Sequence, residues 1–155
     1  MKGTKKVIDI LNKNLALELT AINQYMVNSE ICGNWNYGKL EKVIKGRAIA
    51  EMKHAGKIIE RILFLEGIPI VSKLGEIHIG STVQKIHDND WIAELEAVKN
   101  YNDGIKIALS EGDNGTKELF TENLKDEEEH IDWIESQQDQ IKQMGIERYL
   151  SEQTD

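Results

Sequence analysis

Six side chains that can bind metal ions recur in this chain at one fixed spacing. They are Glu18, Glu51 and His54 in the first half, and Glu94, Glu127 and His130 in the second, each 76 positions after its counterpart. Each half therefore has a single glutamate followed 33 residues later by the pattern Glu-x-x-His. A carboxylate and an imidazole three residues apart lie on one face of a helix, where they can bind one metal ion. The spacing predicts two ions held side by side.

The six residues also occupy positions that should face a protein core. Glu18 continues an apolar helical stripe with Leu11, Leu15 and Ile22, and the other five lie in similar stripes. A buried carboxylate without a partner is unstable or takes up a proton. Because no lysine or arginine interrupts the stripes near these residues, we expect bound cations to balance the charge. The alternative is a buried polar network that only ties the helices together.

Composition restricts the class of protein. A chain of 155 residues is expected to form one domain, 1–155, and a single proline with few aromatic residues favours an all-α fold. The net charge of −8 argues against a nucleic-acid partner and is compatible with attracting metal cations. The single cysteine, Cys32, cannot form an intramolecular disulfide, which fits the cytoplasm. No apolar run is long enough to span a membrane.

Hydrophobic periodicity and helix-breaking residues predict where the elements begin and end. Helices are expected over 4–31, 37–66, 81 or 82 to 110, 116–145 and 146–150. An extended crossover is expected over 68–80 and a loose tail over the last five residues. Gly33 is expected to provide the left-handed backbone after the first helix. A four-helix bundle with one long crossover and a short fifth helix is the ferritin-like arrangement. No repeat is expected beyond the spacing of the six ligands.

The chain resembles the bacterioferritins over nearly its whole length. The stretches that carry the resemblance are Met1-Lys2-Gly3, Glu51-Met52-Lys53-His54-Ala55, Arg61-Ile62-Leu63-Phe64-Leu65-Glu66-Gly67 and Asp126-Glu127-Glu128-Glu129-His130-Ile131-Asp132-Trp133. The resemblance implies a hollow shell of twenty-four identical subunits, built from two-fold dimers, that stores ferric mineral. It also implies a di-iron ferroxidase centre in each subunit and haem b shared between two subunits.

The resemblance assigns a role to each of the six residues. Glu18 and His54 would bind one iron, Glu94 and His130 the other, and Glu51 and Glu127 would bridge the two. Ligand sets rich in carboxylates, with one imidazole per metal, suit iron better than metals that prefer thiolates. Each iron can give one electron to dioxygen or hydrogen peroxide, and ferric iron then passes to the cavity as mineral. Release of iron would need a small ferredoxin-type reductant.

Met52 is the expected haem ligand. It follows Glu51 by one position, so it points about 100° away from the ligand stripe, toward the outside of the bundle. A thioether is a soft, neutral ligand suited to haem iron, and two copies of Met52 related by a two-fold axis would supply both axial positions. Ile22, Asn23 and Met26 would help to line the cleft. The alternative is a methionine that fills a dimer interface.

Two further features of the family bear on the path of iron. Some members have an accessory iron site on the cavity-facing flank of the second helix, where this chain has Gly46, Arg47 and Ala50. These side chains offer no ligand for a cation, so we expect no such site, and we expect His130 to swing aside to release iron inward. The residues that resemble the pore between subunits are Asn34, Glu66, Asp132 and Asp139. The alternative to a pore is that these four residues are scattered polar and acidic residues of the surface.

Four other residues invite a functional interpretation and have a structural alternative. For Tyr25 the alternative to electron donation is a core tyrosine with a satisfied hydroxyl, which we favour. Trp133 is expected to pack rather than to transfer charge. His78 and His87 have no partner at ligand spacing and are expected to be surface histidines.

Two other classes of protein would use a similar ligand set. A peroxidase of the rubrerythrin type carries a Cys-x-x-Cys module, which a chain with one cysteine cannot provide. A storage ferritin without haem would leave Met52 without a role.

Overall fold

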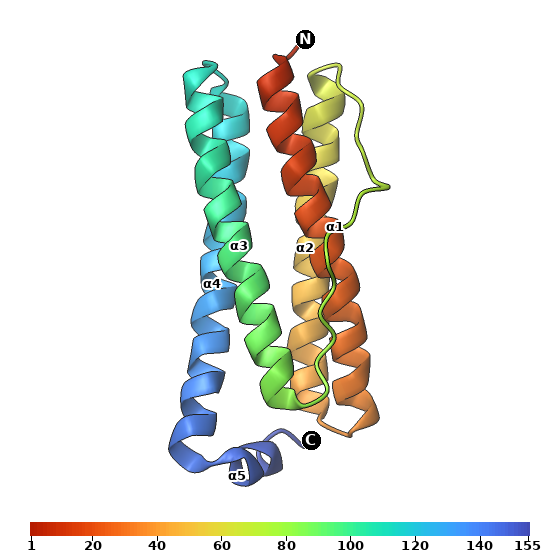
Figure 1. Cartoon of the computed structure of the whole chain (residues 1–155), viewed down its shortest axis with the longest axis vertical. Coiled ribbons are helices and arrows are strands. Elements are labelled where there is room, and N and C mark those ends of the chain that lie inside the picture. The colour runs from red at the N-terminus through yellow and green to blue at the C-terminus, as the bar shows by residue number, and fades with distance from the viewer.

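The computed structural model describes residues 1–155 and consists of five helices without a strand (Figure 1). The helices are α1 (Lys5–Asn34), α2 (Gly38–Phe64), α3 (Val83–Ser110), α4 (Asn114–Met144) and α5 (Ile146–Ser151). α1 packs along α2 and α3 packs along α4 as two antiparallel hairpins, and α5 lies across the far end of the bundle. The expected all-α bundle with a long crossover and a short fifth helix is confirmed. None of the helices combines the length and the apolar character needed to cross a membrane.

The starts of α3 and α4 are fixed by side-chain caps. Thr82, one of the two residues at which we expected this helix to begin, caps α3, because its hydroxyl accepts the backbone N–H of Lys85 at 3.1 Å. α4 begins at Asn114, two residues before the expected start, because the carboxylate of Asp113 accepts the backbone N–H of Thr116 at 2.9 Å. Because Asp113 and not a later residue is the N-cap, α4 begins earlier than we expected.

The expectation for Gly33 is wrong. α1 continues through Asn34, and the left-handed backbone occurs at Asn36, where φ is 63°. Asparagine tolerates this conformation better than most residues with a side chain. Gly33 lies within α1 and faces the carboxylate end of Glu41 on α2, a flexible side chain that would lie 2.7 Å from a Cβ at this position.

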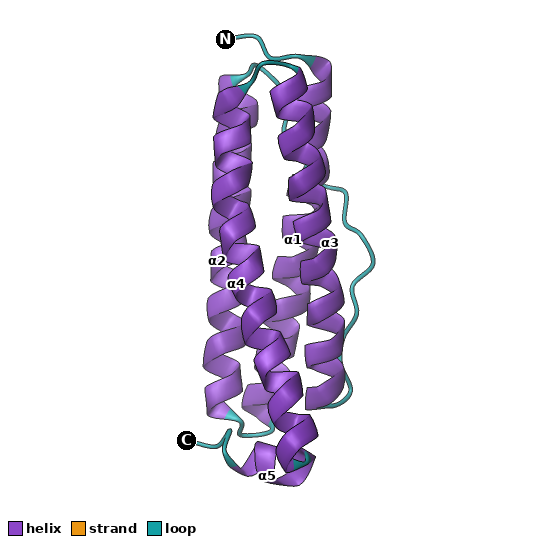
Figure 2. Ribbon diagram, turned by 90° about the vertical axis from the view of Figure 1, so that its left-hand side faces the viewer, coloured by secondary structure: helices purple, strands orange, loops and turns teal.

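The crossover from α2 to α3 runs along α1 for most of the length of the bundle (Figures 1 and 2). Side chains of α1 accept hydrogen bonds from its backbone N–H groups. These bonds join Ile70 to Asn12 at 2.8 Å, Gly75 to Thr20 at 2.8 Å and His78 to Gln24 at 3.0 Å. The polar face of α1 thus replaces the partners that a helix or strand would give to this segment.

The C-terminal residues are not the loose tail that we expected. The carbonyl of Gln153 accepts the backbone N–H of Lys39 at 3.1 Å, in the first turn of α2. The side chain of Lys39 donates to the carbonyl of Glu152 at 3.0 Å, and Lys42 lies 3.4 Å from Asp155. The first turn of α2 has no side-chain cap of its own, so the tail provides an acceptor for it.

Two apolar clusters fill the bundle on either side of a polar layer. One cluster includes Leu11, Leu15, Ile58 and Phe120, all fully buried. The other cluster is toward α5 and includes Leu40, Ile44, Ile86 and Tyr149. The layer between them contains the buried glutamates that the sequence singled out. These glutamates are therefore buried between two apolar clusters.

Candidate metal centre

The structure brings all six predicted ligand residues together in this layer. Each of the four long helices contributes: Glu18 comes from α1, Glu51 and His54 from α2, Glu94 from α3, and Glu127 and His130 from α4. The ligand atoms form two groups of four residues, and within each group they lie within 4.8 Å of one another. Each group is completed by Glu51 and Glu127, which belong to both.

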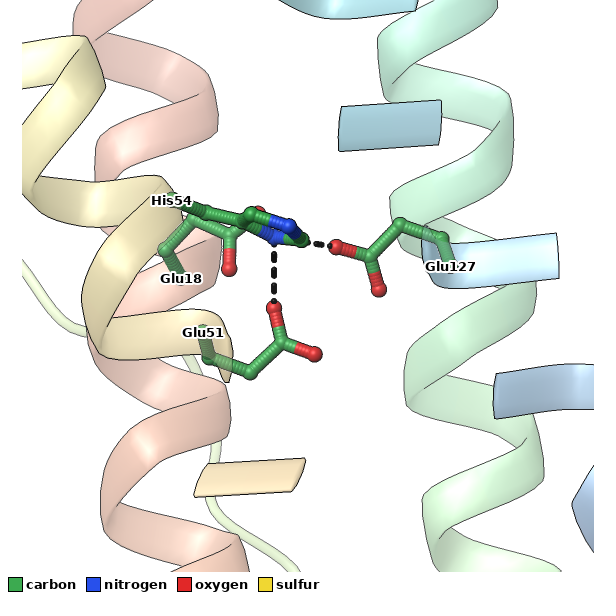
Figure 3. Close-up of side chains that lie close together, drawn as sticks. All are labelled: Glu18, Glu51, His54 and Glu127. Atoms are coloured by element: carbon green, nitrogen blue, oxygen red, sulfur yellow. Dashed lines mark hydrogen bonds and ion pairs between the residues drawn. The ribbon is translucent and has the colours of Figure 1, made fainter. Parts of the chain in front are cut away.

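The first group surrounds Nδ1 of His54 (Figure 3). This atom lies 2.9 Å from Oε1 of Glu127, 3.1 Å from Oε2 of Glu51 and 3.5 Å from Oε1 of Glu18. Figure 3 shows Glu127 reaching this group from the opposite hairpin. A position for a cation is thus surrounded by three carboxylates and one imidazole.

The second group surrounds Nδ1 of His130. This atom lies 3.0 Å from Oε1 of Glu51, 3.2 Å from Oε1 of Glu94 and 3.6 Å from Oε2 of Glu127. Glu51 and Glu127 each turn one carboxylate oxygen toward His54 and the other toward His130. This is the geometry of a carboxylate that bridges two ions.

The burial and crowding of these side chains shift their pKa values. Burial raises the pKa of Glu18, and the charge of Glu51 raises it further. Burial also raises the pKa of Glu94, with a contribution from Glu127. Burial alone would lower the pKa of His130, but the carboxylates close to its ring outweigh burial and raise the pKa to about 12. Four buried carboxylates thus require positive charge beside them.

Several ligand atoms in the centre are also left without a hydrogen-bond partner. These buried atoms are Oε2 of Glu18, Oε1 of Glu51, Oε2 of Glu94 and Oε1 of Glu127. Buried carboxylate oxygens without a donor are costly, and oxygen ligands suit hard cations such as ferrous and ferric iron. The donor set therefore fits two iron ions. The roles of the six residues as ligands stay a prediction from the sequence.

Two tyrosines support the outer glutamates. The hydroxyl of Tyr25 donates to Glu94 at 2.6 Å, and the hydroxyl of Tyr101 donates to Glu18. Tyr101 follows Tyr25 by 76 positions, so the repeat extends beyond the ligands, contrary to our expectation. The same spacing would have identified Tyr101 from the sequence. The hydroxyl of Tyr25 is satisfied, as the structural interpretation required.

The centre lies between two cavities on opposite sides of the bundle. A cavity of about 380 Å³ opens between α1, α3 and the crossover, and Glu18, Glu51, Glu94 and Glu127 line its inner end. A cavity of about 340 Å³ opens between α2 and α4, and its lining includes both ligand histidines. The carboxylates of the centre therefore border the cavity between α1 and α3, and the two histidines border the cavity between α2 and α4.

Arg47 is not on a cavity-facing flank, which corrects our expectation. Its guanidinium is buried and lies 3.1 Å from Oδ2 of Asp90, stacked between the rings of Tyr25 and Trp133. Position 47 is one helical turn from Glu51, so the two side chains point into the same core. Gly46 and Ala50 do border the cavity between α2 and α4.

His87 is also buried, and the expectation of a surface histidine is wrong for it. Its Nε2 atom lies 3.0 Å from the hydroxyl of Tyr149, which donates to Gln137 at 2.7 Å. Spacing along the chain could not predict these hydrogen bonds, because Tyr149 on α5 is 62 residues from His87 and meets it only in the folded bundle. His78 is exposed, as expected. Trp133 packs edge-on against His87, with ring centroids 5.7 Å apart.

The remaining predicted residues lie on the outer surface. Met52 is 57% exposed, and Met26 and Asn23 are also exposed, whereas Ile22 is half-buried. The predicted pore residues Asn34, Glu66, Asp132 and Asp139 are all exposed. Asn34 ends α1 and Glu66 follows the end of α2, at opposite ends of the same hairpin, so these residues do not form one site within a single chain.

Comparison with known proteins agrees with this architecture. The ferritin-like domain family matches residues 8–144. A bacterioferritin from Brucella melitensis is 41% identical over 149 residues, which cover 96% of this chain and 92% of that protein. A bacterioferritin from Streptomyces coelicolor is 37% identical over 97% of this chain and 90% of its own length. A bacterioferritin from Mycobacterium avium is 34% identical over 98% of this chain and 96% of its own length. The chain therefore belongs to the bacterioferritin family of ferritin-like proteins.

Proposed function

We propose that the protein stores iron and that its buried centre is a di-iron ferroxidase site. One observation carries the proposal: Glu51 and Glu127 each direct one oxygen to the His54 group and the other to the His130 group. Two bridging carboxylates hold two ions close enough to react with one oxidant molecule. Glu18 with His54, and Glu94 with His130, then complete the two ligand sets.

The substrate is ferrous iron, and the oxidant is dioxygen or hydrogen peroxide. Two ferrous ions give up one electron each, and the pair reduces dioxygen, with two protons, to hydrogen peroxide. With hydrogen peroxide as oxidant, the same two electrons and two protons yield two water molecules. The six carboxylate and imidazole side chains hold the ions at mid-bundle, and the hard oxygen ligands favour the ferric product. Tyr25 and Tyr101 fix the orientation of Glu94 and Glu18 through their hydroxyls.

The two cavities suggest a direction of travel for iron. Ferrous ions would enter along the carboxylate-lined cavity between α1 and α3, to which negative charge attracts cations. Ferric iron would leave through the cavity that the two histidines border, toward the mineral. The side chain of His130 is 17% exposed and that of His54 only 2%, so His130 is the side chain with room to swing aside. A neutral imidazole can detach without carrying charge into a new environment.

We extend the proposal to the assembly that this centre would serve. The single domain 1–155 would form a homo-oligomer of twenty-four subunits from two-fold dimers, with the mineral inside and the shell in the cytoplasm. The exposed thioether of Met52 would meet its copy across the two-fold axis and bind haem b, beside Met26 and Ile22. Haem would carry electrons from a small ferredoxin-type reductant when stored iron is released.

The ferroxidase proposal is tested by removing one ligand from each half. Glu18→Ala and His130→Ala should each abolish the fast phase of ferrous oxidation followed by stopped-flow absorbance, while the particle stays assembled in size-exclusion chromatography. Glu128→Ala is the matched control, because Glu128 is an exposed neighbour of Glu127 on α4. If both ligand variants oxidise iron at the wild-type rate, the assignment of the centre is wrong.

A further inference from the structure

The two ligand histidines are held differently on the side away from the carboxylates. Nε2 of His54 lies 2.7 Å from Oδ2 of Asp126, which reaches across from α4 to α2. Because Nδ1 of His54 faces the carboxylates Glu51 and Glu127, both ring nitrogens of this histidine are engaged. A carboxylate on the outer nitrogen fixes the tautomer and the ring orientation of a metal-binding histidine and strengthens it as a ligand.

The internal repeat shows that His130 lacks the same support. Asp126 has its counterpart 76 positions earlier at Ala50, just as His130 has its counterpart at His54. Ala50 and His130 border the same cavity as Asp126 and His54, so the two halves can be compared directly. The methyl group of Ala50 cannot accept a hydrogen bond. The greater exposure of His130, 17% against 2% for His54, agrees with a ring that is held only from the carboxylate side.

We propose that Asp126 is a positioning residue that makes the two metal positions unequal. The position at Glu18 and His54 retains its ion, and the position at Glu94 and His130 binds more weakly and exchanges. This inference rests on the proposed function, in which both positions bind ferrous iron, and it identifies the half through which iron moves. Removal of an outer hydrogen-bond partner from a metal-binding histidine lowers affinity by about 10- to 100-fold, so a difference of this size is expected between the two positions.

The test uses Co²⁺, a redox-stable probe whose visible absorption reports its ligands. Titration of the metal-free assembled protein should give two binding steps per subunit, separated by about 10- to 100-fold in dissociation constant. Asp126→Ala should weaken the tighter step by about the same factor, so that the two steps merge. Glu128→Ala, which removes an exposed carboxylate from the same helix, is the matched control and should leave both steps unchanged.

A gain-of-affinity variant separates positioning from damage to the fold. Ala50→Asn places an amide oxygen beside His130 without adding a carboxylate that could bind metal itself. It should tighten the weaker step by about tenfold or more and leave the tighter step unchanged. Combined with Asp126→Ala, it should reverse which position fills first, and the Co²⁺ spectrum of the first equivalent should change accordingly.

The outcomes distinguish failure of this inference from failure of the proposed function. Two equivalent Co²⁺ steps in the wild-type protein, or an unchanged separation in Asp126→Ala, would overturn the role of Asp126. Fewer than two Co²⁺ ions per subunit, with His54→Ala binding as many as the wild type, would contradict the centre itself. Two separated steps that respond to both Asp126→Ala and Ala50→Asn support the inference.

Discussion

His87 should make the metal-free protein sensitive to mild acid. Its Nε2–H donates to the hydroxyl of Tyr149, because that hydroxyl itself donates to Gln137. Nδ1 is buried and has no partner, so the imidazole is neutral in the folded protein. Burial, together with the smaller effect of the charge of Arg47, lowers the pKa of His87 from 6.5 to about 3. Protonation would place a second cation in the core beside Arg47.

The sign and size of the effect follow from the two pKa values of His87. The folded pKa lies below the unfolded value of 6.5, so the stabilising contribution is complete above pH 6.5 and is lost as the pH falls toward 3. Each pH unit within this window changes the free energy of unfolding by about 1.4 kcal/mol. At pH 5 the contribution of His87 is therefore reduced by about 2 kcal/mol relative to pH 7.

The assay compares the wild-type protein with His87→Gln, whose amide can still donate to Tyr149 but does not titrate. Urea unfolding of the metal-free protein at pH 7 and pH 5 gives the free energy of unfolding of each. The wild type should lose about 2 kcal/mol more than His87→Gln between these pH values. His78→Gln, at an exposed position of the crossover, is the matched control for the loss of a histidine. An equal loss in the wild type and in His87→Gln would refute the reasoning.

Three further predictions concern ligands and metal. Met52→Leu should give an assembled particle without haem bands that still oxidises ferrous iron, and a normal haem spectrum would contradict axial ligation by Met52. Crystals soaked in ferrous iron under air should show His130 in two conformations and no iron between Gly46 and Ala50. Iron between these residues, or a single conformation of His130, would contradict the proposed path of iron. The affinity for Co²⁺, measured by titration, should fall as the pH is lowered, because the raised pKa values of Glu18 and Glu94 let protons compete with the metal. A Co²⁺ affinity that is independent of pH between 5 and 7 would contradict this prediction.

The sequence was sufficient to predict the bundle and the meeting of the six ligand residues because both depend on helical periodicity. Glu18 continues the stripe of Leu11 and Leu15, so the core that buries these leucines must also bury the glutamate. The second half repeats this arrangement at an offset of 76 positions. Two pseudo-equivalent hairpins with the same register necessarily bring their polar positions to one layer.

Contacts between hairpins were the part that periodicity could not predict. The 76-position repeat singles out Tyr101 on α3, but it does not show that its hydroxyl reaches Glu18 on α1. It also does not show that Asp126 on α4 reaches His54 on α2. Such contacts depend on how closely the helices approach, which composition does not determine. His87 was misjudged for the same reason, since its partner Tyr149 arrives with α5 from the end of the chain.

For Arg47, the resemblance to the family led to a wrong prediction of the side chain's location. The likeness to family members with an accessory site placed Arg47 on the cavity-facing flank of the second helix. Its distance of one helical turn from Glu51 already indicated the opposite face, and the structure buries it against Asp90. For Gly33 the helix-capping rule was the source of the error, because the left-handed residue after α1 is Asn36.

The central claim is that Glu51 and Glu127 bridge two iron ions within one subunit. Crystals of the metal-free protein soaked in ferrous iron without oxygen, and measured on both sides of the iron absorption edge, test it directly. The account predicts two anomalous peaks per subunit, one among Glu18, Glu51, His54 and Glu127 and the other among Glu51, Glu94, Glu127 and His130. A single peak, or iron bound only outside this layer, would contradict it.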